Sequence, residues 1–398
     1  MGQTEQNRPA IPRWLSGIAP LIFLGLLITF FLLKGPVGLF LEGFPPVEEL
    51  TVERIELRPE QIIAHVVNGG PDTVTVAQVM VDEAYWQHTI EPGQVIPHLG
   101  RAKITLAYPW VEGETHAFRI ITSTGITFDH EIAVAVESPQ PDFRYVTTFA
   151  LLGVYAGIVP VFIGLMWFPF LRELSKKWLH FFLSLTVGLL LFLGVDAVHE
   201  AFETAEGVAG AFQGVGLIGI GIIASVLGLI AFGQQRRHRG ANRDSSEARL
   251  NIAYMIALGI GLHNFGEGLA IGAAYNLGEI SLGMFLVIGF MLHNTTEGLA
   301  IIAPVAADRP GIKHLIGMGA LAGLPIVPGA WIGGFSYSPV WATLFFAIGA
   351  GAIFQVVYEL AKLIQRQAVE GTAPMMNYAG LMAGLLIMYV TAMFVVAG

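Results

Sequence analysis

The chain has 398 residues, of which 54% are hydrophobic and only 13% are charged, and its mean hydropathy is +0.64. Soluble domains carry about 25% charged residues, so this composition excludes an ordinary soluble enzyme and predicts a polytopic membrane protein. The sequence contains no cysteine, which excludes disulfides and thiolate metal ligands, and its net charge of −9 conceals charges that are strongly segregated along the chain.

An apolar run of about 20 residues extends from Trp14 to Leu33, which is the length that a bilayer core requires. Arg8 and Arg13 precede it. A secretory signal peptide has a shorter apolar core and a small-residue cleavage pattern, whereas this run ends in large apolar residues followed by lysine, glycine and proline. We therefore expect a retained anchor, with residues 1–40 forming the N-terminus and one transmembrane helix.

Residues 46–142 have a different character, with short alternating segments such as 61–67 and 73–79, and turn sequences such as Asn68-Gly69-Gly70 between them. Roughly six or seven strands in about 95 residues predict a small all-β domain of immunoglobulin-like type. Its histidines form no tight ligand pair in the sequence, so satisfied or surface histidines are favoured over a metal-capturing site. These histidines are His65, His88, His98, His116 and His130.

Eight further apolar segments follow, each long enough for a membrane-spanning helix. They lie near residues 145–168, 178–201, 208–232, 251–275, 281–303, 312–335, 340–361 and 375–397. Lysine and arginine occur in the loops after the first, third, fifth and seventh segments, whereas the loops at 203–207, 276–279 and 335–339 contain none. The positive-inside rule then makes the N-terminus cytoplasmic, and the β domain and C-terminus extracytoplasmic. Residues 145–398 are predicted to form an eight-helix domain of a multi-pass protein of the cell membrane.

One nine-residue segment occurs twice in this domain. The copies are His263-Asn264-Phe265-Gly266-Glu267-Gly268-Leu269-Ala270-Ile271 and His293-Asn294-Thr295-Thr296-Glu297-Gly298-Leu299-Ala300-Ile301. Residues i and i+4 share one helix face, so the histidine and the glutamate of each copy point the same way. Each copy lies near the middle of its helix, where an ionisable group costs about 2.5–3.5 kcal/mol and normally faces a partner or a watery cavity.

The residue types in the two copies suit metal ligation. Imidazole nitrogen and carboxylate oxygen bind Zn²⁺, Fe²⁺, Mn²⁺, Co²⁺ and Cd²⁺, and the lack of thiolates disfavours copper(I). A divalent cation bridged by Glu267 and Glu297 would neutralise both carboxylates. Asn264 and Asn294 lie about 100° further round each helix, where their amide oxygens are available to a second cation. The alternative is an interhelical hydrogen-bond cluster that only holds two helices together.

These features together resemble the ZIP (Zrt/Irt-like) family of zinc and iron permeases. The resemblance rests on the eight helices after residue 145, the arginine-rich loop after the third helix, and the paired His-Asn-x-x-Glu-Gly segments. It implies a binuclear transport site between the fourth and fifth family helices. It also implies that the first metal is held by His263, Glu267, His293 and Glu297, and the second by Asn264, Glu267, Asn294 and Glu297.

The sequence departs from the family pattern in the segment near 312–335. Many prokaryotic members carry a glutamate there that completes the second metal position, whereas this chain has Ile326 near the expected place. The second position is therefore expected to be weaker, completed by water, or absent. Pro325 and Pro328 are expected to kink this helix.

Four polar residues mark the outer end of the segment near 178–201. Asp196, His199, Glu200 and Glu203 follow i, i+3, i+4, i+7 spacing, which places them on one helix face. The pattern fits an acidic funnel that draws cations toward the transport site, and it fits an ordinary solvated helix end equally well.

A further acidic residue, Glu359, lies toward the cytoplasmic end of the segment near 340–361. It resembles the acidic position that the family has on its inward path. A ligand on the exit path and an interfacial salt bridge to Lys362 are both open interpretations.

The resemblance and the repeated motif predict a transporter of divalent transition-metal cations, not an enzyme. Zn²⁺ is the expected substrate, with Fe²⁺, Mn²⁺ and Cd²⁺ open, and import by alternating access follows from the family alone. The lipid bilayer is the expected environment, and no prosthetic group or nucleic acid is expected. A homodimer is one candidate assembly. The alternative is an intramembrane metalloenzyme, either a zinc hydrolase or a di-metal oxidase.

Overall fold

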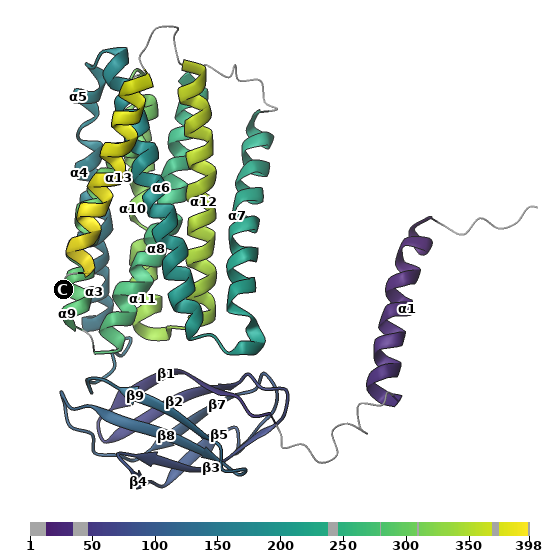
Figure 1. Cartoon of the computed structure of the whole chain (residues 1–398). Helices are drawn as coiled ribbons and strands as arrows, with labels where there is room; N and C mark the ends of the chain where they lie inside the picture. The colour runs from purple at the N-terminus through teal and green to yellow at the C-terminus, as the bar shows by residue number, and fades with distance from the viewer. Residues whose placement is uncertain are drawn as a thin grey trace, which may run out of the picture. The chain divides into compact units, whose positions relative to one another are not determined.

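The computed structural model describes residues 13–34, 47–237, 246–278, 280–308, 310–367 and 374–396. The chain divides into two compact units, Met1–Val47 and Glu48–Gly398. The first unit contains helix α1 (Arg13–Lys34), whose side chains are exposed throughout its apolar stretch Ile18–Phe31 (Figure 1). A helix that exposes apolar residues all round is suited to lipid. It covers the segment predicted to be the anchor, and that role stays a prediction; Arg8 lies outside the described residues.

The second unit begins with strands that form two sheets (Figure 1). The strands in the described residues are β1 (Leu50–Arg58), β2 (Gln61–Asn68), β3 (Val74–Val81), β4 (Ala84–Tyr85), β5 (His88–Glu91), β6 (Val95–Ile96), β7 (Arg101–Leu106), β8 (His116–Thr122) and β9 (Thr127–Ile132). One sheet has the order β1-β2-β7-β5. The other has the order β4-β3-β8-β9, with β6 paired to β3. All of these pairings are antiparallel.

Alternation along the strands builds the core of this β domain. In β8, alternate residues such as Phe118 and Ile120 are buried and those between them are more exposed, as the two-residue period of a strand requires. Ile104 from the first sheet and Val79 from the second belong to the same apolar core. The strands β4 and β6 were not predicted from the sequence, because two residues are too few to show the alternation of buried and exposed side chains. The immunoglobulin-like type stays a prediction.

The remainder of the unit is helical (Figure 1). Its elements are α3 (Phe143–Gly153), the π-helical turn η1 (Val154–Ile158), α4 (Val159–Leu165), α5 (Phe168–Arg172), α6 (Lys176–Glu206), the 3-10 turn η2 (Gly210–Phe212), α7 (Gly214–Arg237), α8 (Ser246–Asn276), α9 (Ile280–Ile302), the 3-10 turn η3 (Ala303–Val305), α10 (Ile312–Gly323), α11 (Ile326–Ser336), α12 (Pro339–Gln367) and α13 (Pro374–Val396).

Seven helical segments in the described part of the chain are long and apolar enough to cross a membrane, which makes the protein a multi-pass membrane protein. They are Phe143–Arg172, Lys176–Glu206, Gly210–Ala231, Ile280–Val305, Ile312–Ser336, Pro339–Gln365 and Met375–Met393. Helix α8 has 31 residues and is long enough but does not reach this hydropathy, because it combines polar residues of the repeated motif with charged residues in its first turn. The loop residues Arg239 and Arg243 lie outside the described residues.

Two segments predicted as single helices are interrupted. The π-helical turn η1 separates α3 from α4, and Leu324 and Pro325 form a turn between α10 and α11. The second interruption lies at the predicted proline kink, because proline has no N–H for the helical ladder. The first had not been predicted.

The β domain contacts two loops of the helical bundle. Arg54 donates from Nη1 to the backbone oxygen of Phe335 at 2.8 Å, and the backbone N–H of Gly210 donates to Oε1 of Glu49 at 2.7 Å. Phe335 precedes the α11–α12 loop, and Gly210 lies between α6 and α7. Both connections are among those that lack lysine and arginine, so the β domain lies on the same side of the bundle as these loops.

Candidate metal centre

Helices α8 and α9 carry the two copies of the repeated motif. All six polar residues of these copies are buried, and none is more than 5% exposed. These residues are His263, Asn264 and Glu267 on α8 and His293, Asn294 and Glu297 on α9. Three of them, His263, Glu267 and His293, have ligand atoms that all lie within 4.8 Å of one another. The structure therefore gathers donors from both helices at one point.

Glu267 is the centre of this group. Its Oε1 lies 3.3 Å from Nε2 of His263 and also contacts Nε2 of His293. The two imidazole rings have centroids 6.5 Å apart and planes at 49° to each other. Two imidazoles that meet one carboxylate oxygen match the donor set of a divalent transition metal.

The two asparagines point their amide nitrogens at backbone carbonyls. Nδ2 of Asn264 donates to the oxygen of Ala322 at 3.1 Å. Nδ2 of Asn294 donates to the oxygen of Ala156 and to Oε2 of Glu267, each at 2.9 Å. Both side-chain amides are fully buried, so their oxygens must point in other directions within the protein.

Several acceptors in the group have no donor. Within the described part of the chain, no hydrogen-bond partner is found for Oδ1 of Asn264, Oδ1 of Asn294 or Nδ1 of His263. The carboxylate of Glu297 also has no hydrogen bond of good geometry there, although the Asn264 side chain is close enough to interact with it. Unsatisfied buried acceptors are costly. Glu297 stands outside the three-residue group, but it interacts electrostatically with Glu267. The predicted ligand Glu297 is therefore buried, but its carboxylate is not among the ligand atoms that lie within 4.8 Å of one another.

The glycine after each motif glutamate brings a neighbouring helix close. A Cβ on Gly268 would clash with the backbone oxygen of Ile326 on α11, and one on Gly298 would clash with the backbone oxygen of Val161 on α4. Small residues allow such close backbone approach between membrane helices. The motif therefore supplies polar donors and the packing surface that surrounds them.

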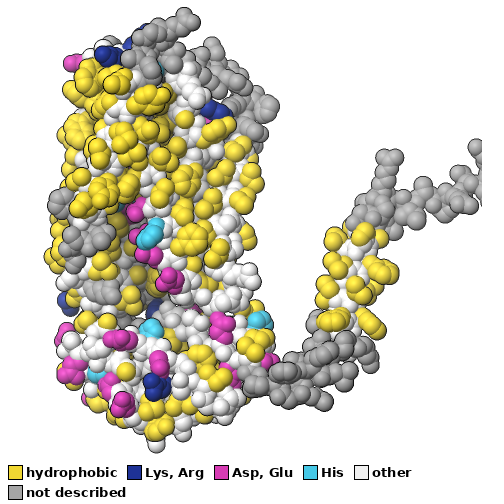
Figure 2. Space-filling model, viewed as in Figure 1, with side chains coloured by type: hydrophobic (Ala, Val, Ile, Leu, Met, Phe, Trp, Pro, Cys, Tyr) yellow, Lys and Arg dark blue, Asp and Glu magenta, His cyan; other side chains and the backbone are white. Residues whose placement is uncertain are grey.

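The predicted acidic face of α6 combines exposed and half-buried residues. His199 and Glu203 are exposed and lie 3.5 Å apart, whereas Asp196 and Glu200 are half-buried. Figure 2 shows acidic and histidine side chains interrupting the hydrophobic surface of the helices on the face in view. Glu200 interacts electrostatically with Asp196 and with Glu267. Glu200 is therefore the residue of this face that interacts with the buried group.

Two other predicted positions, Glu359 and Ile326, are not among the three residues that converge in the described part of the chain. Glu359 on α12 is buried and has an interaction partner of its own, while Nζ of Lys362 lies 3.9 Å from the ring centroid of Tyr358. Ile326 is fully buried and packs in an apolar cluster with Ala156 and Ile271. An apolar side chain therefore occupies the place where an acid was considered.

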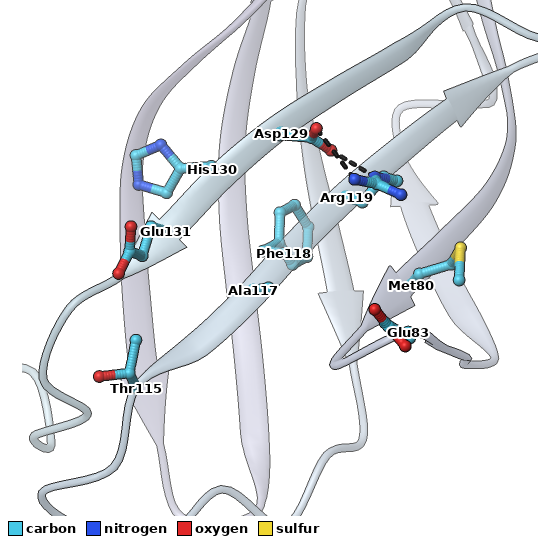
Figure 3. Close-up of a pocket in the computed structure, with 9 residues that line it drawn as sticks. All are labelled: Met80, Glu83, Thr115, Ala117, Phe118, Arg119, Asp129, His130 and Glu131. Carbon is cyan, nitrogen blue, oxygen red and sulfur yellow. Dashed lines mark hydrogen bonds and ion pairs between the residues drawn. The ribbon is translucent and has the colours of Figure 1, made fainter.

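A separate hollow of about 460 Å³ lies on the β domain (Figure 3). Its lining includes Glu83, Glu131 and the pair Arg119 and Asp129, in which Arg119 Nη2 lies 3.1 Å from Asp129 Oδ2. Burial lowers the pKa of His130, which also lines it. Arg119 and Asp129 in this hollow pair with each other. Among its lining residues there is therefore no convergence of metal-ligand atoms like that of His263, Glu267 and His293.

Comparison with known protein families gives one match. The family model of the ZIP zinc transporters matches residues 231–392, which include α8 to α12 and both copies of the motif. This region of the chain is similar to the ZIP zinc transporters. The match confirms the resemblance that the sequence predicts, and members of the ZIP family are transporters of zinc and other divalent metals rather than enzymes. A search among curated proteins finds no significant match.

The sequence prediction missed the carbonyls of Ala156 and Ala322, which accept hydrogen bonds from the two asparagines of the α8–α9 group. A signal for the first was present. Pro160 lies four residues after Ala156 within an apolar segment, and a proline at that position leaves the earlier carbonyl without its helical donor.

Proposed function

We propose that this protein moves divalent transition-metal cations, Zn²⁺ foremost, across the cell membrane into the cytoplasm by alternating access. The observation that carries the proposal is the set of buried acceptors without donors around Glu267. A group that only joined two helices would pair these atoms with donors, whereas a cation satisfies several acceptors at once.

The chemistry of the donors supports one principal metal position. His263, Glu267 and His293 already converge, and a side-chain rotation of Glu297 would add a fourth ligand. Four nitrogen and oxygen ligands suit tetrahedral Zn²⁺. Imidazole and carboxylate can exchange a metal with water, as a transport site requires.

A second position would depend on the amide oxygens of Asn264 and Asn294. Ile326 contributes no oxygen there, so this position would need water to complete its coordination. We propose that it binds metal more weakly than the first position.

The proposed route uses the α6 face. Cations would be attracted by Glu203 and Asp196, and Glu200 would pass them toward Glu267. Placing the lysine- and arginine-containing loops in the cytoplasm makes this face the outer end of α6, and the inward direction of transport is proposed from the family resemblance alone. In this arrangement α8 is an eighth membrane-spanning helix of the bundle, since the long helices on either side of it both cross the membrane.

Transport is tested with purified protein in liposomes that contain a metal-sensitive dye. We expect Zn²⁺ uptake by the unchanged protein and its loss in His263→Ala and Glu267→Ala. His314→Ala is the matched control, because His314 lies exposed on α10 and bonds to Tyr254 instead of the cluster. Unimpaired uptake by both cluster variants would contradict the proposal.

A further inference from the structure

The helix that faces Asn294 contains an irregular turn. Between α3 and α4, the backbone N–H of Val159 bonds to the oxygen of Val154, five residues back instead of four. Pro160 follows directly and has no N–H. In a regular helix the oxygen of Ala156 would accept from the N–H of residue 160. This turn therefore leaves the Ala156 carbonyl available to an outside donor, as π-bulges often do at functional sites.

Asn294 supplies that donor. Its Nδ2 donates to the oxygen of Ala156 and to Oε2 of Glu267, both at 2.9 Å. A carbonyl and an ionised carboxylate only accept hydrogen bonds, so both hydrogens of the amide are used and its orientation is fixed. Oδ1 must then point away from these two partners, and it is buried without a donor in the described residues.

The same arrangement occurs on the other side of the site. Nδ2 of Asn264 donates to the oxygen of Ala322, which lies next to the turn at Leu324 and Pro325. Past this turn, the N–H of Val327 bonds to the oxygen of Leu324 at 3.1 Å, so the regular ladder is interrupted. Oδ1 of Asn264 is likewise buried and unpaired among the described residues.

We propose that Pro160 is a positioning residue for the metal site: by keeping the Ala156 carbonyl free, it holds the Asn294 amide with its oxygen directed toward the cation. On the other side of the site, the turn at Leu324 and Pro325 interrupts the ladder and Asn264 bonds the Ala322 carbonyl, but the residue four positions after Ala322 is Ile326, so Pro325 is not assigned the same role. The inference rests on the proposed function, because it assumes that a cation is bound. Without these carbonyls an amide could turn its NH₂ group toward the cation, which would repel it. Partners of this kind typically change metal affinity about 10- to 100-fold.

The test compares Zn²⁺ affinity, measured by calorimetric titration, in Pro160→Ala and in the unchanged full-length protein. The alanine restores an N–H that can occupy the Ala156 carbonyl, so we expect affinity to fall about tenfold. Replacing Pro160 by lactic acid, the α-hydroxy analogue of alanine, removes the ring but adds no N–H, and affinity should stay unchanged. Pro328→Ala is a second control, since Pro328 is an exposed proline of α11.

A second background separates positioning from a general structural effect. In Asn294→Asp, a carboxylate presents an oxygen in either orientation, so adding Pro160→Ala should cost no further affinity. The inference would be overturned if Pro160→Ala lowered the Zn²⁺ affinity equally in the unchanged protein and in Asn294→Asp, or if it did not lower the affinity of the unchanged protein. Should Pro160→Ala not fold, Asn294→Leu compared with Asn294→Asp keeps the inference testable: loss of the amide oxygen should lower the Zn²⁺ affinity about tenfold, and an unchanged affinity would overturn the inference. Failure of the unchanged protein to bind Zn²⁺ would instead refute the proposed function.

Discussion

Arg249 and Asp308 form a bidentate ion pair, in which Nε of Arg249 lies 2.7 Å from Oδ2 of Asp308 and Nη2 lies 2.6 Å from Oδ1. Arg249 is in the first turn of α8, and Asp308 follows η3 after α9. The pair therefore joins the ends of the two segments that carry the metal-site motifs. Both side chains are mostly buried, at 21% and 11% exposed, so solvent screens the interaction less than at an open surface.

Removing this pair should loosen the bundle. We expect Arg249→Met to lower the free energy of unfolding by about 2 kcal/mol, because the mostly buried carboxylate of Asp308 would lose its bidentate donor. Thermal unfolding in detergent measures the effect. The exchanged pair, Arg249→Asp with Asp308→Arg, should recover part of the loss, and a deficit equal to the sum of the two single changes would count against a direct interaction.

Glu297 should matter through its charge. Glu297→Gln keeps the shape but removes the second carboxylate near Glu267, so we expect Zn²⁺ affinity to fall by at least about tenfold, with the fold retained. Calorimetric titration of the purified protein measures this. Glu173→Gln, an exposed glutamate between α5 and α6, is the control. Equal affinity in the Glu297 variant would mean that this carboxylate stays outside the coordination sphere.

Helical periodicity explains how much of the site could be predicted from sequence. A spacing of four residues predicted that His263 and Glu267 share a face, and they lie 3.3 Å apart. The apolar lengths likewise predicted the membrane-spanning helices. Periodicity within α8 and α9 does not identify partners on other helices. Pro160 indicated that the Ala156 carbonyl lacks a helical donor, but not that Asn294 would be the side chain that bonds it. That bond depends on a π-helical turn that shifts the register by one residue.

The contact between Arg54 and Phe335 shows the same limit for the β domain. Alternating residues predicted strands, but the docking of a strand residue on a helix end depends on the folded positions of both. The short strands β4 and β6 were missed because two residues carry no period. Local patterns therefore predicted elements, and the contacts between distant elements emerged only in the structure.

Acid should destabilise the first sheet of the β domain through Glu56. A hydrogen bond from His65, together with Arg54 and Arg58, lowers the pKa of Glu56 to about 2, against an ordinary value of 4.5. A lowered pKa in the folded state gives stability that is present above the unfolded value and is lost as protons bind the folded carboxylate. Stability from this group should therefore be complete above pH 4.5 and fall between pH 4.5 and about 2.

The measurement is hydrogen exchange of the β1 and β2 amides in the full-length protein, corrected for the intrinsic exchange rate. Protection should decrease across this pH window in the unchanged protein. Glu56→Gln should already lack the contribution at pH 6 and should show a flatter profile. A profile as steep as that of the unchanged protein would assign the acid sensitivity to other carboxylates.

Ile326 offers the sharpest test of the second metal position. Ile326→Glu would add a carboxylate to a fully buried place at the start of α11, close to the helices that carry Asn264 and Asn294. A buried carboxylate is costly unless a cation neutralises it. We therefore expect the variant to bind one additional Zn²⁺ per chain, measured by elemental analysis, and its thermal stability to rise more steeply with Zn²⁺ than that of the unchanged protein.

Val327→Glu is the matched control, because the side chain of Val327 packs toward Gly153 on α3, and a carboxylate there should add no metal. Unchanged metal content in Ile326→Glu, in a protein that remains folded, would show that the amide oxygens and the new carboxylate do not share one site.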